Sequence, residues 1–419
     1  MITNELIEEK ERFIGEIRES GSYSFPPSAD YPVSDLEDGR RGMMFALLIA
    51  ETKTKERIVL KAFSGMARGR LRVPGYANPC FSTTKYQAML DESDREVKEL
   101  TKKIEEGTAT KEERTALTNS WLEKIARLYR FTDIDGNTFG IEDIAERKMP
   151  TGTGDCAGIK VLNEAMRRGY KINAFGEFFY GKDTKEKKSG EFYPPCTERC
   201  EKIIKRMLGL DFVYIDDDIA VVNKDAGLLS VPGRGPDKQD CVASRFRKVF
   251  PDAPEQPFVH RLDMDTSGLL ILARTKEAQR TLSMDFEARR VHKEYEAVLD
   301  GRLEEAEGII DLPMRLDVDN RPYQIVDHER GKAARTRFVR LGYTTIRGQV
   351  CTRVRYYPET GRTHQLRVHS ASGLKMPIHG DRLYGVREEG DRLLLHAAKI
   401  TFMHPSTREE MTIEVSVPF

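Results

Sequence analysis

The chain has 419 residues, of which 32% are charged, and its 68 basic and 68 acidic side chains balance to a formal net charge of zero. This length predicts two or three domains that each bury a core, and the neutral balance excludes a chain-wide field for nucleic acid. No apolar run reaches the ~18 residues that a membrane span needs, and the acidic N-terminus is unlike a signal peptide. The six cysteines are too sparse for a disulfide framework and fit reduced thiols. We therefore expect a cytoplasmic protein with no membrane partner.

Residues 1–210 are predicted to form an N-terminal extension. A helix is expected over residues 1–20, followed by a proline-rich connection, and two apolar runs of strand length, 43–50 and 57–63, predict a β-hairpin.

A highly charged segment, 83–128, carries apolar residues at helical spacing and is interrupted at residues 107–110. It predicts two long antiparallel helices, and Thr110 followed by Glu113 resembles a capping box at the start of the second. A charged helical hairpin of this kind more often serves as a packing arm or spacer than as a catalytic part.

Cysteine-containing turns are expected over residues 151–200. The glycine-rich stretch 151–158 precedes a helical pattern, but its spacing fits neither dinucleotide nor phosphate-loop motifs. Cys156, Cys196 and Cys200 could supply three metal thiolates, yet a C-x-x-x-C pair with one distant cysteine is a loose zinc pattern. All eight histidines lie at or after residue 260, so this half offers no imidazole as a fourth ligand. Buried or turn thiols are the preferred interpretation, and no metal site is predicted.

The character of the sequence changes near residue 210. Residues 212–224 predict a strand, an acidic turn and a second strand, and helices are expected over 242–250 and 276–289. Short strands with Gly or Pro turns follow from Tyr295 onward. Residues 211–419 therefore predict a second domain of the α+β class, with a large, mostly antiparallel sheet and flanking helices.

A dense polar cluster in this second domain lies directly before a buried-strand signal. The apolar run is Leu269 to Ala273, Gly268 allows a tight turn into it, and the polar residues are His260, Arg261, Asp263, Asp265, Thr266 and Ser267. Asp, Ser and Thr often cap turns with no chemistry attached. Two acids, an arginine and a histidine so close together favour a site at the edge of a packed scaffold.

The segment 331–370 has a one-signed charge within a neutral chain. It contains one acid, Glu359, and nine basic residues: Lys332, Arg335, Arg337, Arg340, Arg347, Arg353, Arg355, Arg362 and Arg367. Such a segment is typical either of a surface that contacts phosphates or of a solvated strand face.

Several motifs of residues 211–419 occur together in a known order: Asn223-Lys224, 227–233, 260–268, Lys293 with Tyr295, 361–369 and Gly380-Asp381. In order and spacing they resemble the motifs of RluA-type pseudouridine synthases, and residues 228–233 and 320–322 favour the RluA branch of that family. Asp225 departs from the proline usual after Asn-Lys, which we expect to alter a turn rather than the chemistry. Residues 1–210 match no recognised module.

The resemblance implies a cofactor-independent enzyme that isomerises uridines in structured RNA, namely 23S ribosomal RNA, the tRNA anticodon stem-loop or both. The target nucleotide is hidden in a stack and must be flipped into a pocket. Asp263 is implied as the nucleophile or base that starts glycosidic bond cleavage, and Arg367 as the cation that keeps it ionised. Tyr295 is implied to stack on the flipped base and to help move the proton from carbon 5.

Further residues are implied to bind the substrate: Leu366 as an apolar wall, Arg261 as an RNA contact, and Arg362 and His364 beside them. The implied partner is RNA and not DNA. Purely structural roles are the alternative, since Tyr295 could be a core strand residue and Arg367 could reach solvent. The joint occurrence of the motifs favours the catalytic assignment.

Two other functions fit parts of the sequence. A metal-dependent hydrolase could use a set of eight residues: His260, His364, His369, His379, His396, Asp263, Asp265 and Asp381. No H-x-H or H-E-x-x-H pattern occurs, and the His364–His369 spacing suits neither a strand face nor a helix face. A non-catalytic RNA-binding protein of the same fold is the other alternative. The set of Asp263, Arg367 and Tyr295 argues against it, because binding alone does not need a carboxylate that faces phosphates.

Overall fold

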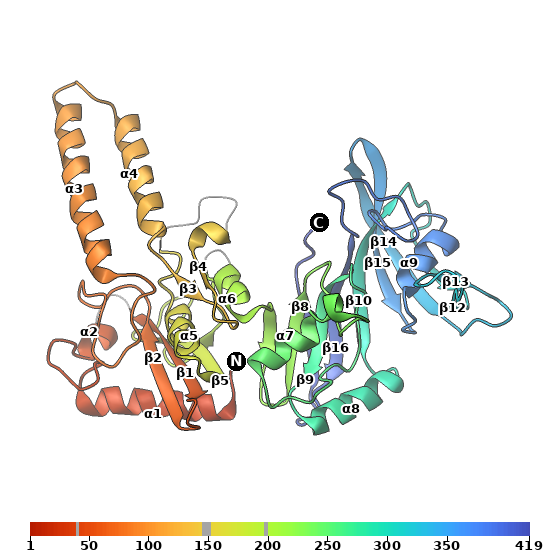
Figure 1. Ribbon diagram of the computed structural model, residues 1–419, viewed down its shortest axis with the longest axis horizontal. Helices are drawn as coiled ribbons and strands as arrows, with labels where there is room; N and C mark the ends of the chain where they lie inside the picture. The colour runs from red at the N-terminus through yellow and green to blue at the C-terminus, as the bar shows by residue number, and fades with distance from the viewer. Residues whose placement is uncertain (39–41, 145–151, 197–199) are drawn as a thin grey trace. The chain divides into compact units, whose positions relative to one another are not determined.

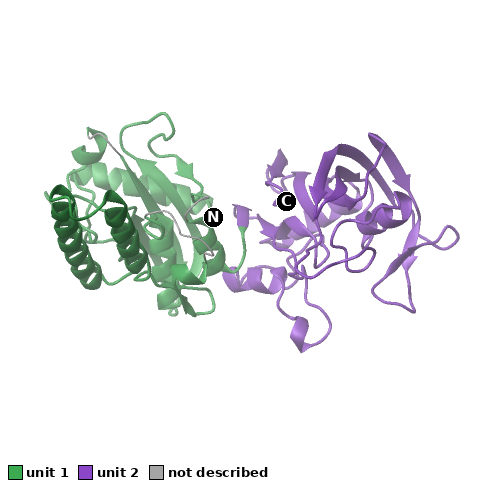
Figure 2. Ribbon diagram, turned by 90° about the horizontal axis from the view of Figure 1, so that it is seen from above, with its two compact units in different colours: residues 1–211 green, residues 212–419 purple. Residues whose placement is uncertain are grey.

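A computed structural model describes residues 1–38, 42–144, 152–196 and 200–419. It divides into two compact units, Met1–Asp211 and Phe212–Phe419, called unit 1 and unit 2 below (Figure 2). No helix among the described residues combines the length and the apolar character that crossing a membrane requires.

Unit 1 is built on a four-stranded sheet with the order β2-β1-β5-β6. Its elements are α1 (Asn4–Ser20), α2 (Ser34–Glu37), β1 (Met43–Glu51), β2 (Arg57–Phe63), α3 (Thr83–Glu105), α4 (Lys111–Ala126), β3 (Phe131–Thr132), β4 (Thr138–Phe139), the 3-10 turn η1 (Ile141–Asp143), α5 (Ala157–Arg168), β5 (Lys171–Tyr180), β6 (Phe192–Tyr193) and α6 (Glu201–Leu208). Both α1 and α5 pack on this sheet (Figure 1). Phe13 and Ile17 of α1 join Phe45 and Leu47 of β1 in one core. Residues 45–50 of β1 are all buried, and since successive side chains point to opposite faces, both faces of this strand are covered.

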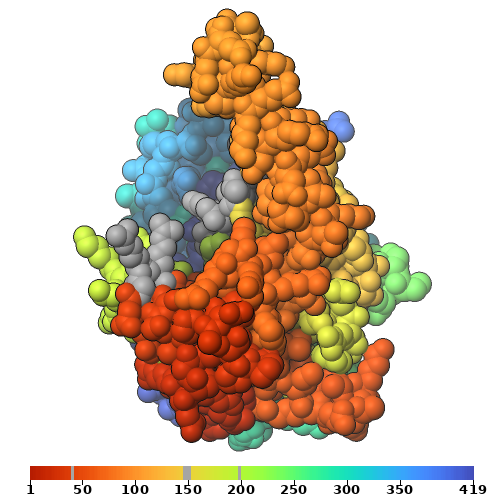
Figure 3. All heavy atoms as spheres, turned by 90° about the vertical axis from the view of Figure 1, so that its left-hand side faces the viewer, coloured from red at the N-terminus to blue at the C-terminus, as the bar shows by residue number. Residues whose placement is uncertain are grey.

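The helices α3 and α4 form a hairpin that stands away from the rest of unit 1 (Figure 3). Its second helix begins with the expected capping box, in which Thr110 and Glu113 bond each other's backbone amides. The helix α3 has no fully buried residue. Trp121 of α4 is buried and donates its Nε1–H to Glu96 of α3 at 2.7 Å, which ties the two helices together.

Two of the cysteines in unit 1 differ from the expectation of reduced thiols. Cys156 and Cys200 form a disulfide, whereas Cys80, Cys196, Cys241 and Cys351 are free. The reason is geometric: Cys156 is the N-cap of α5 and Cys200 is the N-cap of α6, so two helix starts bring the thiols together. Thr151 of the glycine-rich turn and residues 197–199, between Cys196 and Cys200, lie outside the described residues.

Unit 2 is an α+β unit with one large sheet in the order β11-β14-β15-β10-β16-β9-β8-β7, and β17 pairs with β16. Its elements are β7 (Phe212–Ile215), β8 (Ile219–Lys224), the 3-10 turn η2 (Pro236–Lys238), α7 (Val242–Val249), β9 (Ser267–Ala273), α8 (Lys276–Glu287), β10 (His292–Asp300), β11 (Glu307–Asp311), β12 (Met314–Leu316), β13 (Gln324–Val326), β14 (Arg335–Ile346), β15 (Gln349–Pro358), α9 (Gln365–Val368), the π-helical turn η3 (His369–Gly373), β16 (Leu395–Met403) and β17 (Glu410–Glu414). The pairing of β9 with β16 is parallel and the other recorded pairings of this sheet are antiparallel, as the predicted fold class requires.

The strand β9 follows the polar cluster directly and is buried along its whole length. Gly268 lies inside this strand, paired with Ala397 of β16, and not in a turn before it. It has φ +112°, and a Cβ there would lie 2.3 Å from the Ala397 carbonyl oxygen. The prediction of a tight turn at Gly268 was therefore wrong: glycine is required because two backbones approach closely.

Candidate active site

The loop before β9 is held by a buried lysine. Lys224, at the end of β8, is 1% exposed and donates to the carbonyl oxygens of Asp225 at 2.8 Å, Leu228 at 2.8 Å and Met264 at 3.0 Å. Burial lowers the pKa of Lys224 to about 8, against the opposing charge of Asp263 and neighbouring acids. The lysine therefore ties the residues after β8 to the residue next to Asp263 and adds positive charge beside that carboxylate.

A second clamp fixes the same loop on the other side of Asp263. Ser230 donates its hydroxyl to the carbonyl oxygen of Leu262 at 2.7 Å and accepts the Leu262 amide at 3.1 Å. With residues 262 and 264 both held, the backbone of Asp263 has little freedom. Its side chain keeps 25% exposure, so a substrate can reach it.

Arg367 lies beneath this carboxylate. It belongs to α9, its side chain is 3% exposed, and its Nη1 lies 3.9 Å from Oδ2 of Asp263. Its shortest contacts go elsewhere: Nε and Nη2 donate to the two oxygens of Asp381 at 2.8 and 2.6 Å. Arg367 is thus locked by a two-point ion pair, with its third nitrogen directed toward Asp263.

Asp381 is the residue of this network whose part the sequence analysis missed. It is fully buried and accepts hydrogen bonds from the amides of Leu383 and Tyr384 at 2.8 and 3.2 Å. Burial acts to raise the pKa of Asp381, but the hydrogen bonds and charge of Arg367 together with the two amides outweigh it, so the pKa is lowered. The signal was present, because Gly380-Asp381 is one of the matching motifs, but its pairing partner could not be read from the chain.

Tyr295 is the predicted stacking residue. It is 8% exposed on β10 and lies opposite Tyr356 of β15 and Ala397 of β16, next to an irregularity in the β10–β16 register. Burial, and then the charge of Asp263, raise the pKa of its phenol, so the hydroxyl stays protonated at neutral pH. Tyr295 is thus brought near Asp263 from the other half of the sheet.

The remaining residues predicted to contact the substrate differ in burial. Leu366 is buried at 7% exposure beside Arg367, and His364 lies in a left-handed conformation with its Nδ1 2.8 Å from the Tyr384 hydroxyl. Burial lowers the pKa of His364, with Asp263 acting in the opposite direction. Arg362 is exposed and donates to the carbonyl oxygen of Ala333 at 3.1 Å, and Arg261 is exposed two residues before Asp263.

The other histidines of the hydrolase alternative bond to separate partners. His260 accepts the amide of Ile271 at 3.0 Å and stacks on Phe286, and burial lowers its pKa to about 3. The ring of His369 lies 3.0 Å from the Thr336 hydroxyl, that of His396 lies 2.8 Å from the Ser267 hydroxyl, and that of His379 lies 2.7 Å from Asp300. Among the described residues, the groups whose ligand atoms lie close together do not include Asp263, Asp265 or Asp381.

Much of the basic segment 331–370 is neutralised by nearby acids, of which Asp311, Glu294 and Glu296 lie on other strands. Five of its nine basic residues form ion pairs: Arg335 with Asp311 and Glu359, Arg347 with Glu388 and Asp391, Arg353 with Glu296, Arg355 with Glu294 and Glu296, and Arg367 with Asp381 and Asp263. The excess of arginine in the sequence is therefore largely a feature of sheet packing and of the site. The segment 331–370 is therefore a weaker surface for phosphate contacts than its composition suggested.

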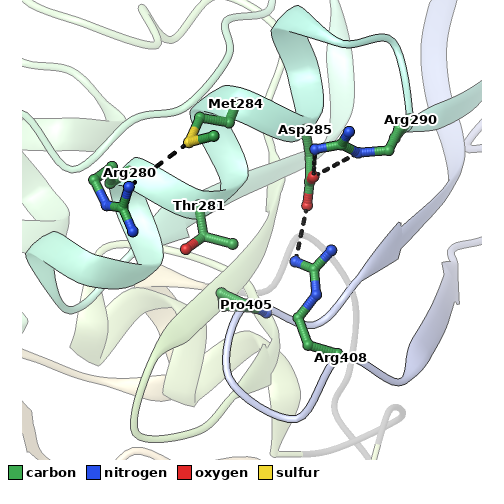
Figure 4. Close-up of a pocket in the computed structure, with 7 residues that line it drawn as sticks. All are labelled: Arg280, Thr281, Met284, Asp285, Arg290, Pro405 and Arg408. Carbon is green, nitrogen blue, oxygen red and sulfur yellow. Dashed lines mark hydrogen bonds and ion pairs between the residues drawn. The ribbon is translucent and has the colours of Figure 1, made fainter.

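A second basic feature, a shallow pocket, lies between α8 and the turn before β17 (Figure 4). Its lining includes Arg280, Arg290 and Arg408, of which the last two contact the buried carboxylate of Asp285. Asp285 accepts hydrogen bonds from Arg290 at 2.5 Å and from Arg408 at 3.3 Å, so one carboxylate compensates part of the positive charge of the pocket. None of the predicted site residues lines this pocket.

Known proteins are similar in sequence to part of this chain. The family model described as RNA pseudouridylate synthase matches residues 218–372. The dual-specificity RNA pseudouridine synthase RluA of Escherichia coli (strain K12) is 44% identical over 213 residues, which cover 50% of this chain and 94% of that relative. The protein of the same name from Vibrio parahaemolyticus is also 44% identical over 213 residues, covering 50% of this chain and 84% of the relative.

The chain belongs to the RluA-type family of RNA pseudouridine synthases. This confirms the resemblance noted in the motifs and makes the protein an RNA-modifying isomerase. Neither the comparisons nor the site favours the hydrolase or the non-catalytic alternative. Among solved structures, human RNA pseudouridylate synthase domain containing 1 is similar, with a TM-score of 0.43, 32% identity, and coverage of 50% of this chain and 84% of that one.

Proposed function

We propose that Asp263 starts the isomerisation of a flipped uridine, acting as nucleophile or base without a cofactor. The observation that carries this proposal is the position of Arg367. A buried guanidinium, fixed by Asp381, lies 3.9 Å from a carboxylate that a substrate can reach. A fixed positive charge favours the ionised form of that carboxylate, and neither group has to reorganise when the reaction begins.

The neighbouring side chains suit a flipped base. The buried ring of Tyr295 offers a stacking face near Asp263, and its protonated hydroxyl can take part in the transfer of the proton from carbon 5. Leu366 supplies an apolar wall, while Arg261, Arg362 and His364 lie where they can contact the RNA around the base. The exposed Arg261 suits the backbone of a displaced nucleotide.

We propose uridines of 23S ribosomal RNA, the tRNA anticodon stem-loop or both as targets, in the cytoplasm and with no DNA substrate. Support comes from the relatives called dual-specificity RNA pseudouridine synthases. We also propose that residues 1–210 and 211–419 act as separate domains, and that the first contributes to RNA docking or substrate choice. The division of the chain after Asp211 and the projecting α3–α4 hairpin support that assignment.

The test compares the purified wild type with Asp263→Asn and with a matched control, Asp237→Asn, an exposed carboxylate elsewhere in unit 2. Pseudouridine formation is measured on 23S ribosomal RNA and on tRNA transcripts, and RNA binding is measured separately. We expect Asp263→Asn to abolish turnover with binding roughly intact, and Asp237→Asn to behave as wild type. Substantial turnover by Asp263→Asn would remove the assignment.

Targets are tested by mapping pseudouridine in total RNA from cells with and without the gene. Loss of sites in 23S ribosomal RNA and the anticodon loop is expected. Loss at one unrelated position would keep the chemistry and refute the target proposal. Deleting residues 1–205 tests the extension: unchanged site selectivity would contradict its role in substrate choice.

A further inference from the structure

A cluster of three sulfur atoms lies in unit 1, outside the catalytic unit. The Sγ atoms of Cys156, Cys196 and Cys200 all lie within 4.8 Å of one another, although Cys156 is 40 residues before Cys196. Cys156 and Cys200 are bonded, and the Sγ of Cys196 is 3.9 Å from that of Cys156. Cys200 is fully buried, Cys156 is half-buried and Cys196 is exposed, so the cluster is anchored inside unit 1 and opens to solvent at one side.

Two helices begin at this cluster. Cys156 is the N-cap of the twelve-residue α5 and Cys200 is the N-cap of the eight-residue α6, and neither side chain makes a capping hydrogen bond. The amides of Cys200 and Glu201 both donate to the carbonyl oxygen of Cys196, at 3.1 and 3.2 Å, which folds the third cysteine back over the start of α6. Helix N-termini carry partial positive charge and stabilise thiolates.

The surroundings hold the loop before α5 in place. The carboxylate of Asp155 accepts the Tyr129 hydroxyl at 2.9 Å, and buried Lys160 donates to the carbonyl oxygen of Phe63 at 2.9 Å. The carboxylate of Glu177 accepts the amide of Gly158 in the first turn of α5. Cys156 is therefore presented from a rigid support and not from a free loop.

We propose that the reduced forms of Cys156, Cys196 and Cys200 bind one zinc ion. A dithiol reductant supplies two electrons and two protons to open the Cys156–Cys200 bond; the three thiols then release their protons as the sulfurs become ligands. Zinc prefers thiolate sulfur and four ligands. Three thiolates leave one position for water or an exogenous ligand, and the net charge of −1 on the filled site faces two positive helix ends.

The spacing of the sequence made this site look weak, because a C-x-x-x-C pair with a distant cysteine resembles no tight zinc motif. The fold supplies what the spacing lacked, by starting α5 and α6 at the same place. The filled site would link α5 to α6, the last helix of unit 1. This inference does not depend on the proposed RNA targets or on the role of Asp263.

The experiment uses the untagged full-length chain, purified under argon with a dithiol-free phosphine reductant. Zinc per chain is measured by mass spectrometry after dialysis, and Co²⁺ replacement is followed by thiolate-to-metal charge-transfer absorption. Cys196→Ser is the informative variant, because an exposed residue can be changed without disturbing the core. Cys241→Ser is the matched control: it also replaces a helix N-cap cysteine, in α7, where serine is a favourable cap.

We expect about one zinc per chain in the wild type and in Cys241→Ser. Cys196→Ser loses a direct ligand, so its affinity for zinc should fall by more than the roughly 10- to 100-fold that the loss of an outer-shell partner produces. Reduced wild type without zinc or a cobalt charge-transfer band would overturn the proposal, as would equal zinc content in Cys196→Ser. Recovery of Cys156 and Cys200 as a disulfide from cells quenched by acid and alkylation would also overturn it.

Discussion

Buried charged side chains beside two loops, one in each unit, are held in different ways. In unit 2, Arg367 is paired with Asp381 through two hydrogen bonds. In unit 1, Lys160 donates to backbone carbonyls and Glu177 accepts a backbone amide. An ion pair thus holds Arg367, whereas Lys160 and Glu177, like Lys224 of unit 2, fix the main chain.

This difference separates two uses of a buried charge. A side-chain ion pair can hold a third group, Asp263, in a defined field while that group stays open to substrate. Charges that end on backbone groups hold a loop in shape, here the loop that carries Cys156. The first arrangement is suited to reaction, and the second to holding a loop that presents other groups, such as the cysteine of the proposed metal site.

The largest effect is expected from breaking the ion pair of unit 2. Asp381→Ala leaves Arg367 buried without its partner, which should lower the free energy of unfolding of unit 2 by about 3–5 kcal/mol. Pseudouridine formation should be lost as well, because Arg367 no longer has a fixed position. Denaturant unfolding and turnover measure the two effects, and a variant as stable as wild type would contradict the paired arrangement.

The same variant gives a prediction for pH. The pKa of Asp381 is lower in the folded protein than its ordinary value of 3.8, so its contribution to stability is complete above that value and is lost as the pH falls through the lowered pKa. The difference in unfolding free energy between wild type and Asp381→Ala should therefore be constant near neutral pH and shrink in acid. A difference that grows in acid would have the wrong sign.

Gly268→Ala tests the junction between β9 and β16. An added Cβ would meet backbone at 2.3 Å, so unit 2 should lose about 3 kcal/mol or more, or fail to fold. Gly227→Ala is the control: its φ is also positive, at +88°, but nothing lies within 4 Å of an added Cβ. It should lose only about 1 kcal/mol from backbone strain. Equal losses in the two variants would show that strain, not close approach, requires glycine at 268.

The buried charge of unit 1 should matter less. Lys160→Met removes a buried cation whose hydrogen bonds go to carbonyls, so the loss of those bonds is partly offset by the removal of a desolvated charge. We expect a decrease of about 1–2 kcal/mol in the unfolding free energy of unit 1, with turnover unchanged in unit 2. A loss as large as that of Asp381→Ala would erase the distinction between a buried charge in an ion pair and one bonded to the main chain.

The smallest effect is expected in the hairpin. Thr110→Ala removes both the side-chain acceptor and the capping box at the start of α4, which should destabilise the hairpin by about 1 kcal/mol. Faster amide hydrogen exchange confined to α3 and α4 would report it, with α5 and unit 2 as internal references. Faster exchange throughout unit 1 would instead mean that the hairpin is part of the core.

Local signals predicted much of this structure. The spacing of apolar residues and the capping residues located α1, the β1–β2 hairpin, α4 and β9, because these elements depend on neighbouring residues along the chain. What the sequence could not provide are meetings between distant segments: Asp381 with Arg367, Cys156 with Cys200, and Gly268 with Ala397. The charge of Arg353 and Arg355 was misleading for the same reason, since their partner Glu296 lies on another strand.

The position of β16 has a consequence for the synthesis of the protein. This strand lies between β9, which follows Asp263, and β10, which carries Tyr295, yet it is translated after both of them. Until residue 403 has left the ribosome, the two halves of the sheet cannot be joined, and the ring of Tyr295 cannot be fixed near the carboxylate of Asp263. A nascent chain should therefore be inactive toward the RNA that surrounds it until β16 has left the ribosome and its long-range strand pairing is complete.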